Sequence, residues 1–426
     1  MNENTLSQTR EHTELETVLF AGTILVSSGS EVQRTEDTLH HIALSMKMRY
    51  LDAFVTNRGI FATGEKANGQ IETRVVSVPE TDVNIDKIEA VNELSRKIAS
   101  QETSTSVIWS ELDKINRCAD YSSASRVLAY GLGALCFSYA IGTSVRDSLC
   151  AAIIGLLIGF FMLHIHRWIK AKVLITILAS ALIALLGNLC LHLGVGEYLP
   201  VIILGVMIDL VPGVPFVNAV REFSQNNFST GVTLLMSALL SCVSMAAGVA
   251  SVQLFMPDSV LVSMVFSNAD DIGYPIMLMR SIMAGIGTTA FCVMFRVRQN
   301  HFGDCGLLGA ITWFIYMDIC SGTGNGLLAV FISGLLVSIV SRILAVTRKC
   351  PVIVFLMTSL FPLLPGISFY MAVYYLLAGL GTLALDYAMK SFLIAFTLAV
   401  SIVLIQQISV NPRYRKWPTM RFYKQK

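Results

Sequence analysis

Ten runs of about twenty apolar residues follow one another from Arg126 onward, and they limit the fold more than any other feature of the sequence. A run of roughly 20 apolar residues is long enough to cross the hydrocarbon core of a bilayer as a helix. The 426 residues are 54% hydrophobic and 14% charged, a composition too apolar for a soluble protein of this size. The sequence therefore predicts a polytopic α-helical membrane protein. The predicted spans cover residues 126–144, 147–165, 172–193, 198–220 and 230–254, followed by 279–297, 304–320, 326–344, 351–378 and 389–409.

The residues before these runs have a different character. Residues 1–10 are polar and predict a disordered tail, whereas residues 11–125 contain both helical and β-prone patterns. In "YLDAFVTNRGIFATGE", two β-prone segments flank Asn57-Arg58-Gly59, which is typical of a hairpin. The segment "NIDKIEAVNELSRKIAS" has the apolar spacing of an amphipathic helix. Residues 11–125 are therefore expected to form a small α+β domain.

The distribution of lysine and arginine predicts the orientation in the membrane. The spans form two five-helix units, 126–255 and 279–410, separated by a polar linker (256–278) and followed by a basic tail (411–426). With the N-terminal domain inside, the inside loops and the tail hold 15 Lys and Arg, and the outside loops hold only Arg146, Arg280 and Lys390. Because basic residues collect on the cytoplasmic side, both termini and the α+β domain are predicted to be cytoplasmic, in a protein of the cytoplasmic (inner) membrane.

One short sequence occurs twice, once in each unit. "LVPGVPFVNAV" occupies residues 210–220 and "LLPGISFYMAV" residues 363–373, each in the fourth span of its unit. We interpret this as a duplication of a five-helix unit. Because five is odd, the second copy enters the membrane from the opposite side, which predicts the 5+5 inverted repeat typical of many secondary transporters.

The Pro-Gly pair within each repeated segment predicts a break in the helix. Broken backbone in a membrane is tolerated where it is buried in protein or lines a cavity, and a helix that restarts there presents amide hydrogens to an anion. We therefore expect a substrate site near the midplane, although each pair could instead only kink its helix for packing. The expected substrate-binding residues are Pro212, Gly213, Asn218, Pro365, Gly366 and Ser368.

Five motifs in this order resemble the threonine/serine exporter family. They are "GSEVQRTEDTLHHIA", "AFVTNRGIFAT", "KIEAVNELSR", "LVPGVPFVNAVRE" and "FPLLPGISFYMAV", and the resemblance covers about residues 12–410. It implies the fused arrangement, in which a soluble domain precedes both membrane units. It also implies export of threonine and serine, or of dicarboxylates such as succinate in some relatives, driven by the proton gradient.

Asp209 is the ionisable residue that stands out in the fourth span, three residues before Pro212. An acid within a membrane span is costly and usually functional. We expect it to couple protons or to bind the substrate's amine, and the alternative is a carboxylate that caps the following half-helix. Counting from the Pro-Gly pairs, its counterpart in the second unit is Pro362, so the two half-sites differ chemically.

Other classes of function find less support in the sequence. No C-x-x-C, H-E-x-x-H or G-x-S-x-G motif occurs, so neither an enzyme nor a metal site nor a cofactor is expected. No basic cluster suggests nucleic acid. The expected partners are a small amino or carboxylic acid, protons and lipid, and a homo-oligomer remains open. The alternatives of another class are a passive channel and a membrane-tethered sensor.

Overall fold

A computed structural model describes residues 12–407 apart from 80–82, 102, 143, 225, 254, 256–272 and 378. The chain divides into two compact units. One holds the described residues as far as Asp120, with Arg348–Pro351, and the other holds the described residues of Tyr121–Thr347 and those from Val352 to Gln407. The predicted tails, 1–10 and 411–426, and most of the predicted linker lie outside the described residues.

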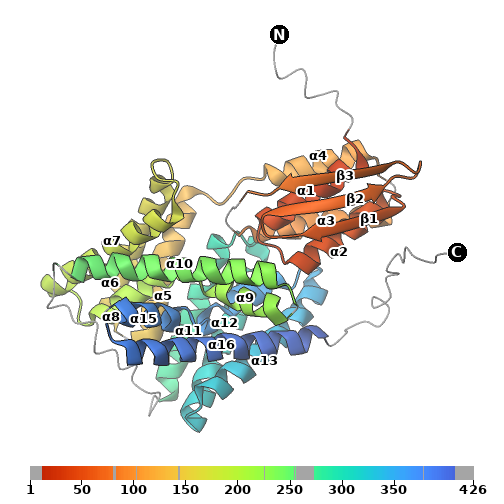
Figure 1. The fold of residues 1–426 in the computed structure, drawn as a ribbon. Coiled ribbons are helices and arrows are strands. Elements are labelled where there is room, and N and C mark those ends of the chain that lie inside the picture. Colours follow the sequence, from red (N-terminus) through yellow and green to blue (C-terminus); the bar gives the residue numbers. More distant parts are fainter. Residues whose placement is uncertain are drawn as a thin grey trace. The chain divides into compact units, whose positions relative to one another are not determined.

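The N-terminal unit combines four helices with a three-stranded sheet (Figure 1). The strands pair antiparallel in the order β1-β2-β3, and Phe54 lies opposite Phe61 across the predicted hairpin. The hairpin and the amphipathic helix are therefore confirmed, and α4 is an addition that the sequence pattern did not predict. The elements are α1 (Glu14–Ser27), α2 (Val32–Ser45), β1 (Tyr50–Val55), β2 (Gly59–Glu65), β3 (Ile71–Ser77), α3 (Ile85–Ser100) and α4 (Thr105–Asn116).

The two faces of this sheet differ in exposure. Along β3, exposed and half-buried residues alternate, because successive side chains of a strand point to opposite faces. Ile71 and Val75 are 67% and 65% exposed. Arg74 and Val76 point the other way and line a pocket together with residues of α1 and α4. The helices therefore cover one face of the sheet.

Helices are the only regular secondary structure among the described residues of the second unit, and its two halves have the same order of elements. In each half, three long helices precede two short ones, and a final long helix follows. The first half comprises α5 (Ser123–Gly142), α6 (Val145–Ile165), α7 (Lys172–His192), α8 (Leu199–Met207), α9 (Gly213–Ser224) and α10 (Phe228–Gln253). The second comprises α11 (Tyr274–Met294), α12 (Phe302–Thr323), α13 (Gly326–Arg348), α14 (Ile353–Ser359), α15 (Gly366–Leu377) and α16 (Gly381–Gln407), with short 3₁₀ turns at Gln299–His301 and Phe361–Leu363.

Eight of the described helices are long and apolar enough to cross a membrane, and α14 with α15 makes a ninth if this pair, bent by 42°, is one span. The predicted break within the span at 198–220 is confirmed, because α8 ends at Met207 and α9 starts at Gly213. The last helix, however, begins at Gly381, eight residues before the predicted start, so the charged residues Asp386 and Lys390 lie within it.

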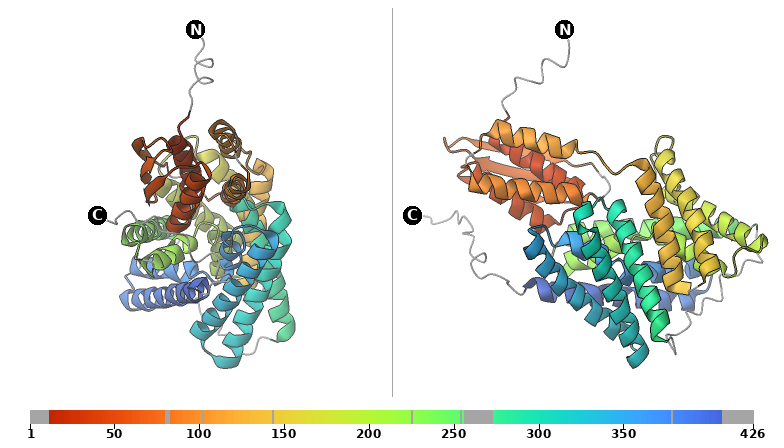
Figure 2. Two further views of the ribbon diagram at one scale, coloured as in Figure 1. Left: turned by 90° about the vertical axis from the view of Figure 1, so that its right-hand side faces the viewer. Right: turned by 180° about the vertical axis from the view of Figure 1, so that it is seen from behind.

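Small residues bring the long helices close together. Figure 2 shows α5 beside α6 and α11 beside α12. A Cβ atom on Gly155 of α6 would lie 2.7 Å from the carbonyl oxygen of Tyr130, and one on Gly285 of α11 would lie 2.7 Å from that of Gly306. Such small-residue contacts are how membrane helices gain van der Waals packing in a lipid solvent. The first helices of the two halves, α5 and α11, also lie against each other.

Candidate functional site

Both helix breaks follow from the proline that each contains. Pro212 and Pro365 have no amide hydrogen, and a proline disfavours the helical conformation in the residue before it. Leu364, which precedes Pro365, is extended, with φ −64° and ψ 134°. The helices restart at Gly213 and Gly366. Each break therefore ends one short helix and presents the first-turn amides of the next, whose acceptors come from outside the helix.

The two breaks lie against each other. A Cβ atom on Gly366 would overlap the side chain of Val211, and one on Gly213 would lie 2.8 Å from Cβ of Leu364. Val211 and Leu364 hold the same position in their segments, one residue before the proline. The Cα atom of Gly213 is 3.8 Å from the position that a Cβ on Gly366 would take. The N-terminal ends of α9 and α15 therefore converge, and the positive ends of two helix dipoles meet there.

The helices that follow the breaks, α9 and α15, also contact each other through equivalent residues of the two halves. One turn further on, the rings of Phe216 and Phe369 stack with centroids 4.6 Å apart and 12° between their planes. Helix α9 lies against α16 of the other half, and α15 lies against α10. Ser391 of α16 donates a hydrogen bond to the carbonyl oxygen of Pro365 at 3.2 Å, which satisfies one acceptor of the broken backbone.

Asp209 lies between α8 and the first break, with its carboxylate inside the protein. Both carboxylate oxygens are buried, and neither has a hydrogen-bond partner among the described residues. A Cβ atom on Gly133 of α5 would lie 3.1 Å from Oδ1, so this glycine makes room for the carboxylate. Burying a charged carboxylate without a partner is expensive. The arrangement therefore suits the uncharged acid, or a carboxylate that receives a cation from a ligand.

An aromatic cluster lies beside this acid and joins the two halves. It consists of Phe137 of α5, Ile208 next to Asp209, Phe291 of α11 and Phe361 before the second break. The ring of Phe291 is 5.3 Å from that of Phe137 and 3.5 Å from that of Phe361, measured between centroids. These rings are almost fully buried, so they form an apolar core. Both broken segments contribute to this core, through Ile208 and Phe361.

A small cavity of about 30 Å³ lies next to the second break. Asn218 of α9 is the polar residue of its lining, and Leu364 and residues of α14 and α16 supply apolar walls. Ser368 is half-buried on α15 but does not line this cavity. The space is about that of one water molecule, so the surrounding helices would have to move apart to admit a larger solute.

The structure brings together most, but not all, of the residues that the sequence singled out. The Pro-Gly pairs meet directly, and Asn218 reaches the second break, whereas Asp209 lies against α5 and does not line the cavity. The sequence analysis missed Gly133 and the aromatic cluster. A signal was present: "GLGALCF" at 131–137 and "GIGTTAF" at 285–291 share Gly-x-Gly-x-x-x-Phe, which contains Gly133 and the two cluster phenylalanines.

Comparison with known families matches both parts of the chain. The threonine/serine exporter family model, ThrE, matches residues 16–256, more than half of the 426 residues. A second model, described as threonine/serine exporter, ThrE, matches residues 280–408. No curated protein and no solved structure matches the chain.

The eight or nine apolar helices among the described residues define a multi-pass membrane protein. With both family matches, the class is a membrane transporter of the amino acid exporter type, not an enzyme. The chain belongs to the threonine/serine exporter family.

Proposed function

We propose that this protein exports threonine and serine by alternating access around the two Pro-Gly breaks, coupled to the proton gradient through Asp209. The observation that carries the proposal is the direct contact between the breaks, next to a buried acid without a partner among the described residues. In this proposal the protein lies in the cytoplasmic membrane with both termini in the cytoplasm, in keeping with the distribution of lysine and arginine.

An inverted repeat would account for the pattern of contacts. Exchanging the two halves turns the contact between α9 and α16 into the contact between α15 and α10, and both occur. The same exchange maps the pair α5 and α11 onto itself, and it exchanges Phe216 with Phe369. A pseudo-twofold axis between the breaks would produce these paired contacts. Alternating access would then be a rocking of one half against the other around a fixed site.

The converging helix ends suit a zwitterionic amino acid. The amides that begin α9 and α15 would bind the substrate's carboxylate, because helix N-termini favour anions. Asp209 would bind the ammonium group, which would provide the partner that its buried carboxylate lacks. Asn218 and Ser368, shortly after the breaks, would offer hydrogen bonds to a side-chain hydroxyl.

Competition at Asp209 would couple export to protons. The same carboxylate cannot hold a proton and pair with an ammonium group at the same time. Facing an acidic exterior, Asp209 would take up a proton and release the substrate. Facing the cytoplasm, it would lose the proton and bind the next substrate. Each export step would then move a proton inward, so the gradient would drive export.

Counterflow in liposomes tests the transport activity itself. Liposomes that contain the purified protein are loaded with unlabelled threonine, serine or succinate and diluted into a trace of the same solute in labelled form. We expect transient accumulation of labelled threonine and serine, and none of succinate. Equilibration without an overshoot would instead indicate a passive channel, and exchange of succinate alone would indicate a dicarboxylate exporter.

A further inference from the structure

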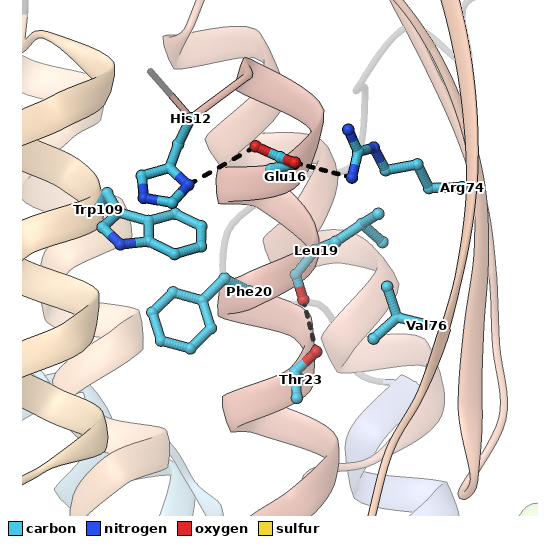
Figure 3. A pocket seen from close by; sticks show the side chains of 8 residues that line it. All are labelled: His12, Glu16, Leu19, Phe20, Thr23, Arg74, Val76 and Trp109. Carbon is cyan, nitrogen blue, oxygen red and sulfur yellow. Dashed lines mark hydrogen bonds and ion pairs between the residues drawn. The ribbon is translucent and has the colours of Figure 1, made fainter. Parts of the chain in front are cut away.

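The N-terminal unit contains a pocket that the transport mechanism does not use. Its volume is about 370 Å³, within the range of roughly 300–1,000 Å³ that is usual for small-molecule sites. It lies between α1, α4 and the edge strand β3 (Figure 3). The residues that line it are His12, Glu16, Leu19, Phe20, Thr23, Arg74, Val76 and Trp109.

Aromatic and aliphatic side chains form most of the pocket wall. The rings of His12 and Trp109 stack with centroids 3.5 Å apart and 9° between their planes, and the ring of Phe20 lies 4.6 Å from that of Trp109. Leu19 and Val76 add aliphatic surface. Leu19 is buried and the other four side chains remain partly exposed, so this apolar wall faces an open hollow. Such a wall suits an apolar or aromatic group of a ligand.

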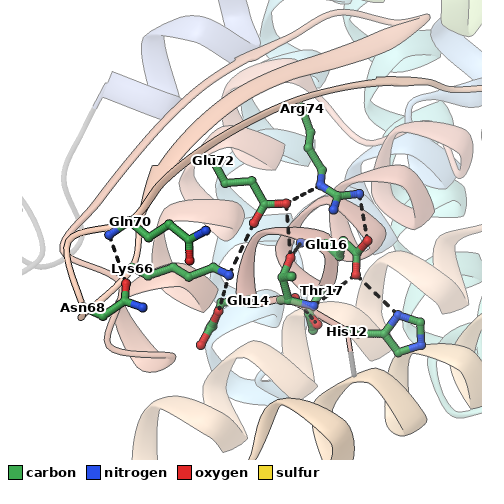
Figure 4. Close-up of polar contacts among 10 residues, drawn as sticks. His12, Glu14, Glu16, Thr17, Lys66, Asn68, Gln70, Glu72 and Arg74 are labelled. Atoms are coloured by element: carbon green, nitrogen blue, oxygen red, sulfur yellow. Dashed lines mark hydrogen bonds and ion pairs between the residues drawn. The ribbon is translucent and has the colours of Figure 1, made fainter. Parts of the chain in front are cut away.

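An ion pair of opposite charges stands at one side of this wall. The Nη1 atom of Arg74 lies 2.8 Å from the Oε1 atom of Glu16. A capping box fixes Glu16: its N–H donates to Oγ1 of Thr13, and its Oε2 accepts the N–H of Thr13. Arg74 is also paired with Glu72, and the charge network continues to Lys66 (Figure 4). The pocket therefore presents one carboxylate and one guanidinium in fixed positions.

We infer that this pocket binds an α-amino acid with an apolar or aromatic side chain. The ligand's carboxylate would meet Arg74, whose five N–H donors are not all used by its two ion pairs, through Nη1 and Nε. Its ammonium group would lie against Glu16, and its side chain against Phe20 and Trp109. A zwitterion matches the paired opposite charges, whereas a simple anion or cation would satisfy only one of them. The site would sense an amino acid of a kind different from the exported threonine and serine.

Equilibrium dialysis of the full-length protein in lipid nanodiscs, with labelled L-leucine and L-phenylalanine, tests this inference. We expect saturable binding of one ligand per chain, weak competition by L-threonine, and none by N-acetyl-leucine, which lacks the ammonium group. Arg74→Gln removes the carboxylate anchor, and Val76→Phe fills the hollow without changing a charge. Each should weaken binding by about tenfold or more.

Two matched variants separate the pocket from general effects and from the transport site. Arg49→Gln also breaks an arginine–glutamate pair of the same unit, with Glu65 at 3.4 Å, but outside the pocket. It should leave binding unchanged, as should Asp209→Asn. Absence of saturable binding at millimolar ligand would overturn the inference. So would binding that survives both pocket variants, or binding that only Asp209→Asn removes.

Discussion

Substitution of Gly366 by alanine should destabilise the protein, although alanine is the better helix former. Gly366 is the first residue of α15 and has no positive φ angle. From helix propensity alone, Gly→Ala would stabilise by roughly 0.5–1 kcal/mol. The new methyl group, however, would overlap Val211, which is buried and stiff because it is branched at Cβ. Overpacking of this kind costs about 1–3 kcal/mol, so the net effect should be destabilising.

The contact between Gly366 and Val211 also predicts which glycine variants lose more stability and which second substitution restores it. Gly213→Ala should cost less, because its methyl group meets the side chain of Leu364, which can change rotamer. Gly322→Ala in α12 is the control, since a Cβ atom there has no neighbour within 4 Å. Val211→Ala should restore much of what Gly366→Ala loses, because it removes the overlapping methyl groups.

The assays are the apparent melting temperature of the purified protein and threonine counterflow in liposomes. Gly366→Ala should lower both, Gly322→Ala should lower neither, and the double variant Gly366→Ala/Val211→Ala should recover. The reasoning is refuted if Gly366→Ala behaves like Gly322→Ala, or if Val211→Ala adds its own loss without any recovery. Either result would mean that the breaks do not press against each other in the membrane.

Three further predictions concern other parts of the molecule. Phe291→Ala should cost about 3–5 kcal/mol and lower the melting temperature sharply, whereas Phe392→Ala, 52% exposed on α16, should not. Burial raises the pKa of Glu36, which accepts the N–H of Val55 at 3.1 Å; its stabilising contribution is therefore present at low pH and lost as pH rises through the folded-state pKa. Glu36→Gln should accordingly raise the melting temperature at about pH 7 but not at about pH 4. Asn218→Leu should reduce counterflow of threonine about tenfold while leaving the melting temperature unchanged.

Backbone chemistry explains which parts of the candidate site could be predicted from the sequence. Proline and glycine have local consequences that do not depend on their neighbours, so both breaks could be placed from the sequence alone. Asp209 was visible for a similar reason, because an acid in an apolar run is conspicuous. Hydropathy alone would have given one helix over residues 198–220, and it is the proline that indicated the division into α8 and α9.

Contacts between distant segments were not predictable in the same way. Gly133 is one small residue among many in an apolar helix, and only the packing of α5 shows that it faces Asp209. The repeated Gly-x-Gly-x-x-x-Phe motif is short, and glycines are common in membrane helices, so it has little weight without the structure. The pocket near Trp109 depends on α4, a helix that the sequence pattern did not indicate, and on the side chains of Arg74 and Val76 in the edge strand β3.

The most direct test of the central claim is threonine flux from liposomes under an imposed pH gradient, with Asp209→Asn measured beside wild type. Asp318→Asn serves as the control, because it neutralises an exposed aspartate on the apolar helix α12. The account predicts that the gradient drives threonine flux in wild type and in Asp318→Asn, and that Asp209→Asn loses the coupled flux while remaining folded. Full gradient-driven flux in Asp209→Asn would contradict the role given to this acid, and flux in wild type that ignores the gradient would contradict proton coupling altogether.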